Sequence, residues 1–210
     1  MEESNLQFIE KTTYGLQIYV SQRGSDGYDS VLFVDMICHI MEVLSKWTGQ
    51  TWIGRKKDKK TEKVFQNFFE ALNSLIGYIN LFEKMMSDEE KEFAMLATYN
   101  GVLYRYMGSG NLGNKECVEI EYNGVYVSWS KNEQNSYIEN KLYGPWLRIK
   151  AQTLPFDYAI DIEGIDKFYQ IITGDDNRVV RGNEREVVYP TIKDSVLEVT
   201  YKPAKRRIAN

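Results

Sequence analysis

The chain has 210 residues, of which 43% are hydrophobic and 13% aromatic, and its formal net charge is −4. This length fits one large domain, or one domain with a helical appendage, and the composition is sufficient for a folded core. The mild charge favours neither a general nucleic-acid binder nor a membrane-surface protein, and no apolar stretch approaches the roughly 20 residues of a membrane helix. The start of the chain lacks the basic and apolar segments of a signal peptide, so we expect a cytoplasmic protein.

The first half of the chain carries mainly helical patterns. Residues 5–21 are the exception, because partial alternation around Gly15 predicts a hairpin or a pair of strands. An apolar helix is predicted from residue 29 or 30 to about residue 47. A second helix is predicted over residues 62–86, where apolar side chains recur with i, i+3, i+4 spacing. Ser87 and Glu90 then form a capping-box motif, which starts a short third helix.

From residue 100 the pattern changes to a period of two residues, which is typical of strands. Asn123-Gly124 joins two alternating runs, and this dipeptide is the strongest short signal for a β-hairpin. Residues 131–152 are predicted to be helical or irregular. The other predicted strands cover residues 101–108, 157–162, 168–173, 184–190 and 195–202.

Together these patterns predict an α+β fold, in which an N-terminal helical region packs on a C-terminal β-rich core. We place the helical region at residues 1–98, the β-rich core at residues 99–202 and a basic tail at residues 203–210, all within one compact unit. Two basic clusters, at residues 55–63 and 201–210, are the places where phosphate or an acidic partner would bind. A solvated loop and a frayed tail are the simpler interpretation of these clusters.

Residues suited to zinc binding or to histidine-based catalysis are scarce. The chain has one histidine, His39, and two cysteines, Cys38 and Cys117, which are far apart in sequence. The lack of paired cysteine spacing argues against a zinc site, so we expect no metal. His39 lies in an apolar helical run, where we expect a packed or hydrogen-bonded core residue rather than the base of a catalytic triad.

Three groups of polar residues interrupt the apolar strands of the second half. Arg105 lies within the run "VLYRYMG", and Ser128 and Ser130 lie within "VYVSWSKN". Glu184 and Glu186 enter the strand at residues 184–190 from a turn, and alternation places both side chains on one face. Two carboxylates that close repel each other. Each group alone is typical of a solvated sheet surface, but their order along the chain is informative.

This order of motifs resembles the arginine–serine–glutamate class of mono-ADP-ribosyltransferases, with bacterial toxin-like and phage-like members. The stretch "LYRYMG" is similar to that family's Leu-Tyr-Arg-Gly stretch, and "VSWSKN" is similar to its Ser-Thr-Ser strand. "GNEREVVYP" is similar to the family's Glu-x-Glu motif, which apolar residues follow. The resemblance covers roughly residues 87–200, and the preceding helices match the family's habit of covering the β core with a helical region.

The resemblance implies an enzyme that cleaves the nicotinamide–ribose bond of NAD and transfers ADP-ribose to a macromolecular acceptor. Glu186 would bind the 2′-hydroxyl of the nicotinamide ribose and stabilise the positive charge that develops on the sugar. Glu184 would orient or deprotonate the acceptor. Arg105 would bind the NAD pyrophosphate or its ribose. Ser128 would hold Glu186 and the ribose, with Ser130 as a weaker second contact.

An aromatic wall for nicotinamide is expected in the segment after the serine strand. Tyr137, Tyr143 and Trp146 are available there, and Tyr137 is slightly preferred. The turn at residues 173–183 would recognise the acceptor. The residues expected to bind NAD are therefore Arg105, Tyr106, Ser128, Ser130 and Tyr137.

The acceptor and the biological role are left open by the sequence. In the family, Glu at the position of Glu184 goes with arginine side chains as acceptors, whereas the basic clusters favour nucleic acid. We expect an intracellular toxin, a phage-defence effector or a phage-encoded modifier of its host, and a toxin would need an antitoxin or inhibitor protein as partner. Two alternatives are an NAD glycohydrolase without a macromolecular acceptor, and a non-enzymatic module that binds nucleic acid or protein.

Overall fold

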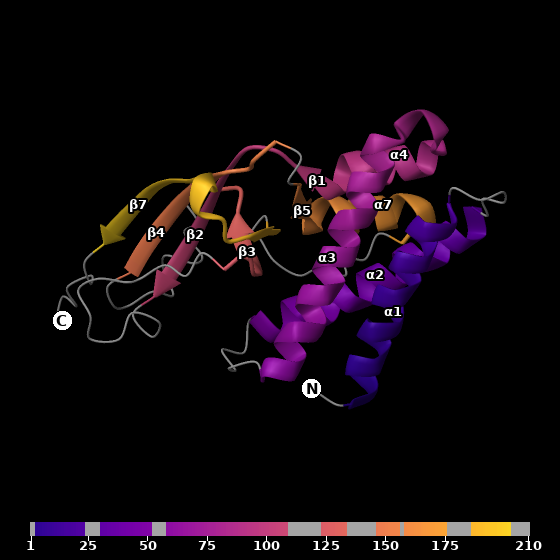
Figure 1. The fold of residues 1–210 in the computed structure, drawn as a ribbon, viewed down its shortest axis with the longest axis horizontal. Coiled ribbons are helices and arrows are strands. Elements are labelled where there is room, and N and C mark those ends of the chain that lie inside the picture. Colours follow the sequence, from indigo (N-terminus) through magenta and orange to yellow (C-terminus); the bar gives the residue numbers. More distant parts are fainter. Residues whose placement is uncertain are drawn as a thin grey trace. The chain divides into compact units, whose positions relative to one another are not determined.

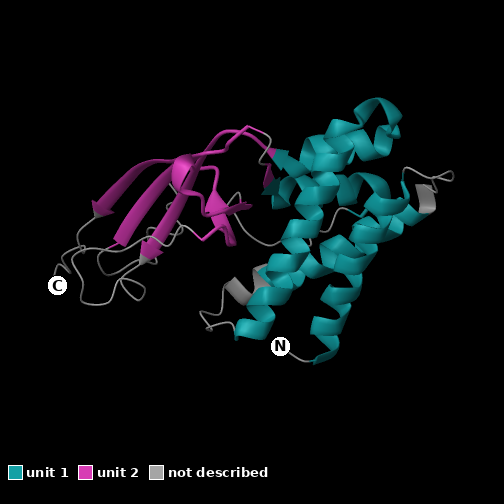
Figure 2. Ribbon diagram, in the orientation of Figure 1, with its two compact units in different colours: residues 1–98, 160–181 teal, residues 99–159, 182–210 magenta. Residues whose placement is uncertain are grey.

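The computed structural model describes residues 3–23, 30–51, 58–108, 123–133, 146–155, 158–175 and 186–202. The fold is α+β, as predicted, and the chain divides into two compact units (Figures 1 and 2). Unit 1 comprises residues 1–98 and 160–181, and unit 2 comprises residues 99–159 and 182–210. Residues 160–181, which the sequence analysis places in the β-rich core, thus belong to the helical unit.

Unit 1 is built from helices around an aromatic core. Phe33 packs edge-on against Phe93 and Phe168, with ring centroids 5.7 Å and 6.4 Å away. Trp47 packs in the same way against Phe65 at 5.1 Å. The helices are α1 (Glu3–Gln22), α2 (Ser30–Thr51), α3 (Lys59–Leu81), the 3-10 turn η1 (Glu83–Met85), α4 (Asp88–Ala97) and α7 (Ile162–Thr173).

Two strand predictions in unit 1 are wrong, and both segments form helices. Residues 5–21 lie in α1, where Leu6, Ile9 and Leu16 are buried at helical spacing, so Gly15 lies inside a helix and not in a turn. Residues 168–173 lie in α7. The Asp161 side chain caps the first turn of α7 by accepting from the Gly164 N–H, and Gly174 ends the helix in the left-handed conformation at φ 67°.

The capping box that was predicted at Ser87 is confirmed. The Ser87 hydroxyl accepts from the Glu90 N–H at 3.2 Å, and the Glu90 carboxylate accepts from the Ser87 N–H at 2.6 Å. Glu90 also accepts from Tyr19 of α1 and from Arg23, which directly follows α1. This one carboxylate therefore starts α4 and joins it to α1.

Unit 2 is an antiparallel sheet with one apolar face. Its strands are β2 (Val102–Gly108), β3 (Tyr126–Ser130), β4 (Trp146–Gln152), β6 (Glu186–Pro190) and β7 (Val196–Lys202), with the 3-10 turn η2 (Lys193–Ser195) before β7. The full order is β1-β5-β6-β3-β2-β4-β7, which includes the short strands β1 (Thr98–Tyr99) and β5 (Ala159–Asp161) (Figure 1). Leu103, Trp129, Ile149, Val187 and Tyr189 are among the buried residues of the apolar face.

Local signals explain most of the sheet. Gly124 has φ 69°, which a turn after Asn123 requires, and β3 follows it. The strand predicted before this turn lies outside the described residues. The predictions of strands at residues 101–108, 184–190 and 195–202 are confirmed by β2, β6 and β7 within the described residues. Residues 146–152, predicted to be helical or irregular, instead form β4, which pairs with β2 along its whole length.

Candidate active site

The three motif strands are neighbours in unit 2. Arg105 lies in the middle of β2, Ser128 and Ser130 lie on β3, and Glu186 is the first residue of β6. The sheet order places β3 between β6 and β2, and the register pairs Ser130 with Glu186. Residues that are 81 positions apart from Arg105 to Glu186 in sequence thus lie on adjacent strands.

Ser128 links the carboxylate to the cation. Its hydroxyl donates a hydrogen bond to Glu186 Oε1, and its main-chain carbonyl accepts from Arg105 Nη1 at 2.8 Å. The Ser128 hydroxyl fixes one oxygen of the Glu186 carboxylate, since a hydrogen bond to an ionised group is stronger than one between neutral groups. Arg105, Ser128 and Glu186 therefore form one connected group.

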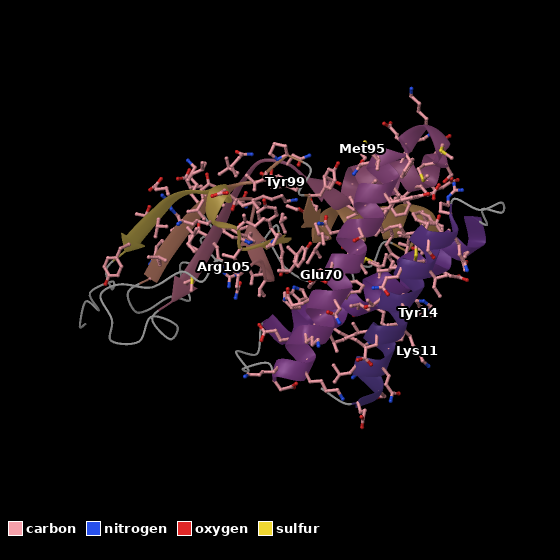
Figure 3. All side chains as sticks on the ribbon, viewed as in Figure 1. Lys11, Tyr14, Glu70, Met95, Tyr99 and Arg105 are labelled. Atoms are coloured by element: carbon pink, nitrogen blue, oxygen red, sulfur yellow. The ribbon has the colours of Figure 1, made fainter. Side chains whose placement is uncertain are left out.

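Alternation along β2 does not predict the contact that the Arg105 side chain makes. The register pairs Tyr104 with Ser130, and Ser130 with Glu186, so these three residues share a face of the sheet. Arg105 is assigned to the opposite, apolar face, where its partner is Ile149. Tyr104 pairs with Ser130 where β2 meets β3, and the guanidinium of Arg105 donates to the Ser128 carbonyl of β3. Arg105 is labelled in Figure 3. A side chain thereby continues the link between the two strands.

Arg105 is a poorly solvated cation. It is half-buried, and burial lowers the pKa of its guanidinium to about 10, so the group keeps its charge at neutral pH. Among the described residues no carboxylate forms an ion pair with it. A charge that has lost water without gaining a counter-ion is strongly attracted to an anion, and a guanidinium fits phosphate oxygens well.

Tyr106 and Ser130 make contacts that order the turn after β3. The Tyr106 hydroxyl donates to the Glu133 carbonyl, and its ring is tilted against Trp146 with centroids 5.5 Å apart. The buried Ser130 hydroxyl accepts from the Asn132 N–H at 3.1 Å. Contact of either residue with NAD stays a prediction.

Several predicted site residues lie outside the described part of the chain. These are Glu184, Tyr137 and Tyr143, together with residues 176–183 of the turn expected to recognise the acceptor. Trp146 is described and is buried at the start of β4 against Tyr106. Within the described residues, the carboxylate, serine and arginine at the centre of the prediction are brought together.

The sequence analysis missed Arg148, which lies on β4. Its guanidinium pairs with Glu133 at 3.0 Å and approaches Glu198 at 3.8 Å, and its carbon centre lies 6.0 Å from the Tyr104 ring centroid. The signal for β4 was present, because Leu147, Ile149 and Ala151 alternate, but the preceding Gly144-Pro145 favoured an irregular segment. With β4 assigned, Arg148 falls on the face of Glu186.

No family model, curated protein or solved structure matches the chain. In the described part of the chain, no helix combines the length and the apolar character needed to cross a membrane. Interpretation of the site therefore depends on its own geometry and chemistry.

Proposed function

We propose that this protein is a mono-ADP-ribosyltransferase, which cleaves the nicotinamide–ribose bond of NAD and transfers ADP-ribose to a macromolecular acceptor inside a cell. The observation that carries the proposal is the connected group of Arg105, Ser128 and Glu186 on three adjacent strands. The motif order alone could arise by chance. Three motifs that converge in space supply the cation, the hydroxyl and the carboxylate that this chemistry needs.

Cleavage of an N-glycosidic bond develops positive charge on the ribose, as in glycoside hydrolysis. A carboxylate at a fixed position next to that carbon stabilises the transition state more than the ground state. Glu186 is the candidate, since the Ser128 hydroxyl holds its carboxylate in a fixed position by a hydrogen bond to Oε1. The orientation of the carboxylate costs little at the moment of reaction because the hydrogen bond is already formed.

The other end of NAD carries two phosphates, and Arg105 is suited to bind them. Its guanidinium donates one hydrogen bond to the Ser128 carbonyl and has further N–H groups for an anion. Binding of the pyrophosphate would offset the lost solvation of this cation. The bond to Ser128 also sets the position of the bound phosphates relative to Glu186.

The acceptor is the less specified half of the reaction. We assign Glu184 the role of orienting or deprotonating the nucleophile, which follows from its position two residues before Glu186. We propose an arginine side chain of a protein as the preferred acceptor. Nucleic acid is the second candidate, because of the basic clusters at residues 55–63 and 201–210. As a toxin or defence effector the protein would be restrained by an inhibitor partner.

The test is release of nicotinamide and labelling of macromolecules from labelled NAD in a cell lysate. Glu186→Gln should lower both by about 10²–10³-fold, because one group that stabilises the developing charge is lost. Glu198→Gln is the matched control, since Glu198 is an exposed carboxylate on β7, at the end of the sheet order, and should leave the rate unchanged. Protease and nuclease digestion of the product then identifies the class of acceptor.

Three outcomes are distinguishable. Nicotinamide release without labelling would indicate a glycohydrolase, and loss of Glu184 should then matter little. If the wild-type protein neither releases nicotinamide nor labels a macromolecule, and calorimetry shows no NAD binding, the proposed enzymatic function is refuted. Equal activity of wild-type protein and Glu186→Gln would refute the assignment of the site.

A further inference from the structure

A half-open hollow of about 480 Å³ lies between α1 and α2 in unit 1. We call it the α1–α2 hollow. Its floor is apolar and contains the half-buried Phe8 and Ile18 and the buried Met36. Its rim carries the exposed side chains of Lys11, Asp35 and His39. A concave apolar floor with a few polar groups at the rim, at this volume, is typical of a small-molecule site.

Gly15 provides a second and independent observation. It lies in the interior of α1, where glycine is among the least favourable residues. Its backbone has ordinary helical geometry, and a Cβ built on it would meet no atom within 4 Å, so neither a turn nor close packing requires glycine here. Gly15 lines the α1–α2 hollow, and what the missing side chain leaves is open space in that hollow. Gly15 thus departs from the residue preferences of a helix interior at a position where the missing side chain keeps the hollow open.

The polar groups of the rim have a defined arrangement. Lys11 follows Phe8 by three residues on α1, so the two share a helix face. The ring of His39 lies edge-on against Phe8, with centroids 5.5 Å apart, which contradicts the prediction of a packed core histidine, since this side chain is exposed. Asp35 precedes His39 by one turn of α2. One end of the hollow therefore offers an ammonium and an imidazole, and the next turn offers a carboxylate.

We propose that the α1–α2 hollow binds an amphipathic small molecule with a flat apolar body, an anionic group and a hydrogen-bond donor. The apolar body covers Phe8, Ile18 and Met36. The anionic group lies at the end with Lys11 and His39, and the donor reaches Asp35. This site belongs to unit 1, is separate from the residues that we assign to NAD, and does not depend on the proposed enzymatic function.

The probe is 1-anilinonaphthalene-8-sulfonate, which combines an aromatic body, a sulfonate and an N–H donor. The full chain should bind it at one saturable site with micromolar affinity, measured by fluorescence titration. Gly15→Leu, which fills the hollow, should weaken binding at least tenfold. Gln17→Leu is the matched control, because Gln17 is exposed on α1 and lines a different hollow, beside α3, and it should bind like the wild-type protein. Circular dichroism checks that both variants fold.

The charge argument has its own test. Lys11→Met should weaken binding of the sulfonate about two- to fivefold, as expected for one exposed ion pair. It should leave binding of N-phenyl-1-naphthylamine, the same ring system without the sulfonate, unchanged. Carbon-13 methyl spectra should show a ligand-induced shift at Met36 on the floor and none at the exposed Met95 of α4 (Figure 3).

Undiminished binding to a folded Gly15→Leu variant would place the dye elsewhere and overturn the proposal. Failure of the wild-type protein to bind either probe would do the same. A Lys11→Met effect of equal size on both probes would overturn the assignment of an anionic ligand.

Discussion

The buried carboxylate of Glu90 provides a stability test whose size follows from its contacts. Its side chain is 0% exposed, and it accepts hydrogen bonds from the Tyr19 hydroxyl at 2.6 Å, from Arg23 Nε and Nη2 at 2.9 Å each, and from the Ser87 N–H at 2.6 Å. Glu90→Gln removes the charge and keeps the shape. All four hydrogen bonds lie within unit 1, so the effect should appear in the unfolding of the helices.

The expected loss is about 3 kcal/mol in the free energy of unfolding. Breaking a buried ion pair on one side costs about 3–5 kcal/mol, because the remaining charge is left without compensation. The lower end applies here, since the Arg23 side chain is 13% exposed and its guanidinium reaches water. The amide oxygen of glutamine also keeps part of the acceptor function. Against a total stability of about 5–15 kcal/mol, this is a large fraction.

The pH dependence gives the prediction a second part. Burial by itself raises the pKa of Glu90, but the hydrogen bonds from Arg23, Tyr19 and the Ser87 main chain outweigh it, so the pKa lies below its ordinary 4.5. A carboxylate with a lowered pKa in the folded state stabilises the fold above its unfolded pKa, and this contribution disappears as pH falls through the folded pKa. The difference between wild-type protein and Glu90→Gln should therefore be full at pH 7 and shrink below pH 4.5.

The assay is urea unfolding followed by far-ultraviolet circular dichroism, which reports on unit 1 because the described α-helices belong to it. Glu89→Gln is the matched control, since it removes the same charge from the same first turn of α4, and its side chain is exposed. It should cost at most about 1 kcal/mol, the contribution of a charge near a helix terminus. A Glu90→Gln loss no larger than that of Glu89→Gln, or one that persists undiminished at pH 3, would refute the reasoning.

Three further predictions test the packing and the proposed site. Gly164→Ala would place a Cβ 1.8 Å from the Leu96 carbonyl oxygen, so α7 has to shift, and unfolding in urea should show a loss of about 1–3 kcal/mol or more; wild-type stability would contradict this contact. Ser128→Ala removes the hydrogen bond to Glu186, worth about 1.5–3 kcal/mol for a charged acceptor, so the free energy of unfolding should fall by no more than that amount, and the rate of nicotinamide release should fall about 10–150-fold if the same energy holds the carboxylate in the transition state; an unchanged rate would separate Ser128 from the chemistry. Arg105→Met should abolish NAD binding in calorimetry and cost no more than about 1 kcal/mol of stability, because only a bond to a carbonyl is lost and a poorly solvated charge disappears; unfolding of this variant would indicate a structural role.

The parts of the fold that the sequence predicts well are those with short-range signals. The Ser87–Glu90 capping box needs only a few neighbouring residues, and it occurs in the structure. Gly124 has the left-handed conformation expected after Asn123, whereas the first strand of the predicted hairpin lies outside the described residues. The segments that were predicted wrongly depend on long-range packing. In α1, Thr12 and Thr13 resemble strand residues, but their hydroxyls bond to carbonyls four residues back and the segment packs against α3.

Helix α7 shows the same competition between local preference and burial. The run at residues 168–173 is aromatic and β-branched, which favours a strand. The cap at Asp161 and the left-handed Gly174 limit a 12-residue helix, and Ile162, Ile165 and Phe168 are buried along one side of it. A window that includes both ends would have revealed the helical period. Tertiary packing in unit 1 decides the outcome.

The residues of the candidate site could be predicted from the sequence, but the contacts between them could not. Residue type and order are enough to select Arg105, Ser128 and Glu186, because each polar residue stands out in an apolar strand. That the Arg105 guanidinium bonds to the main chain of Ser128, and not to a carboxylate, depends on where pairing between β2 and β3 ends. No local pattern specifies that position.

Trp129, between the two serines, explains how the proposed site keeps its register. Its side chain is 3% exposed on the apolar face, and its indole N–H donates to the Tyr189 carbonyl of β6 at 3.0 Å. A slip of one residue between β3 and β6 would turn Glu186 toward the apolar face and break its bond to Ser128. The bulky indole and its hydrogen bond make such a slip costly, so the apolar face of β3 holds the carboxylate in place on the other face. Substitution of Trp129 should therefore reduce catalysis by displacing Glu186, although the indole lies on the opposite face of the sheet from that carboxylate.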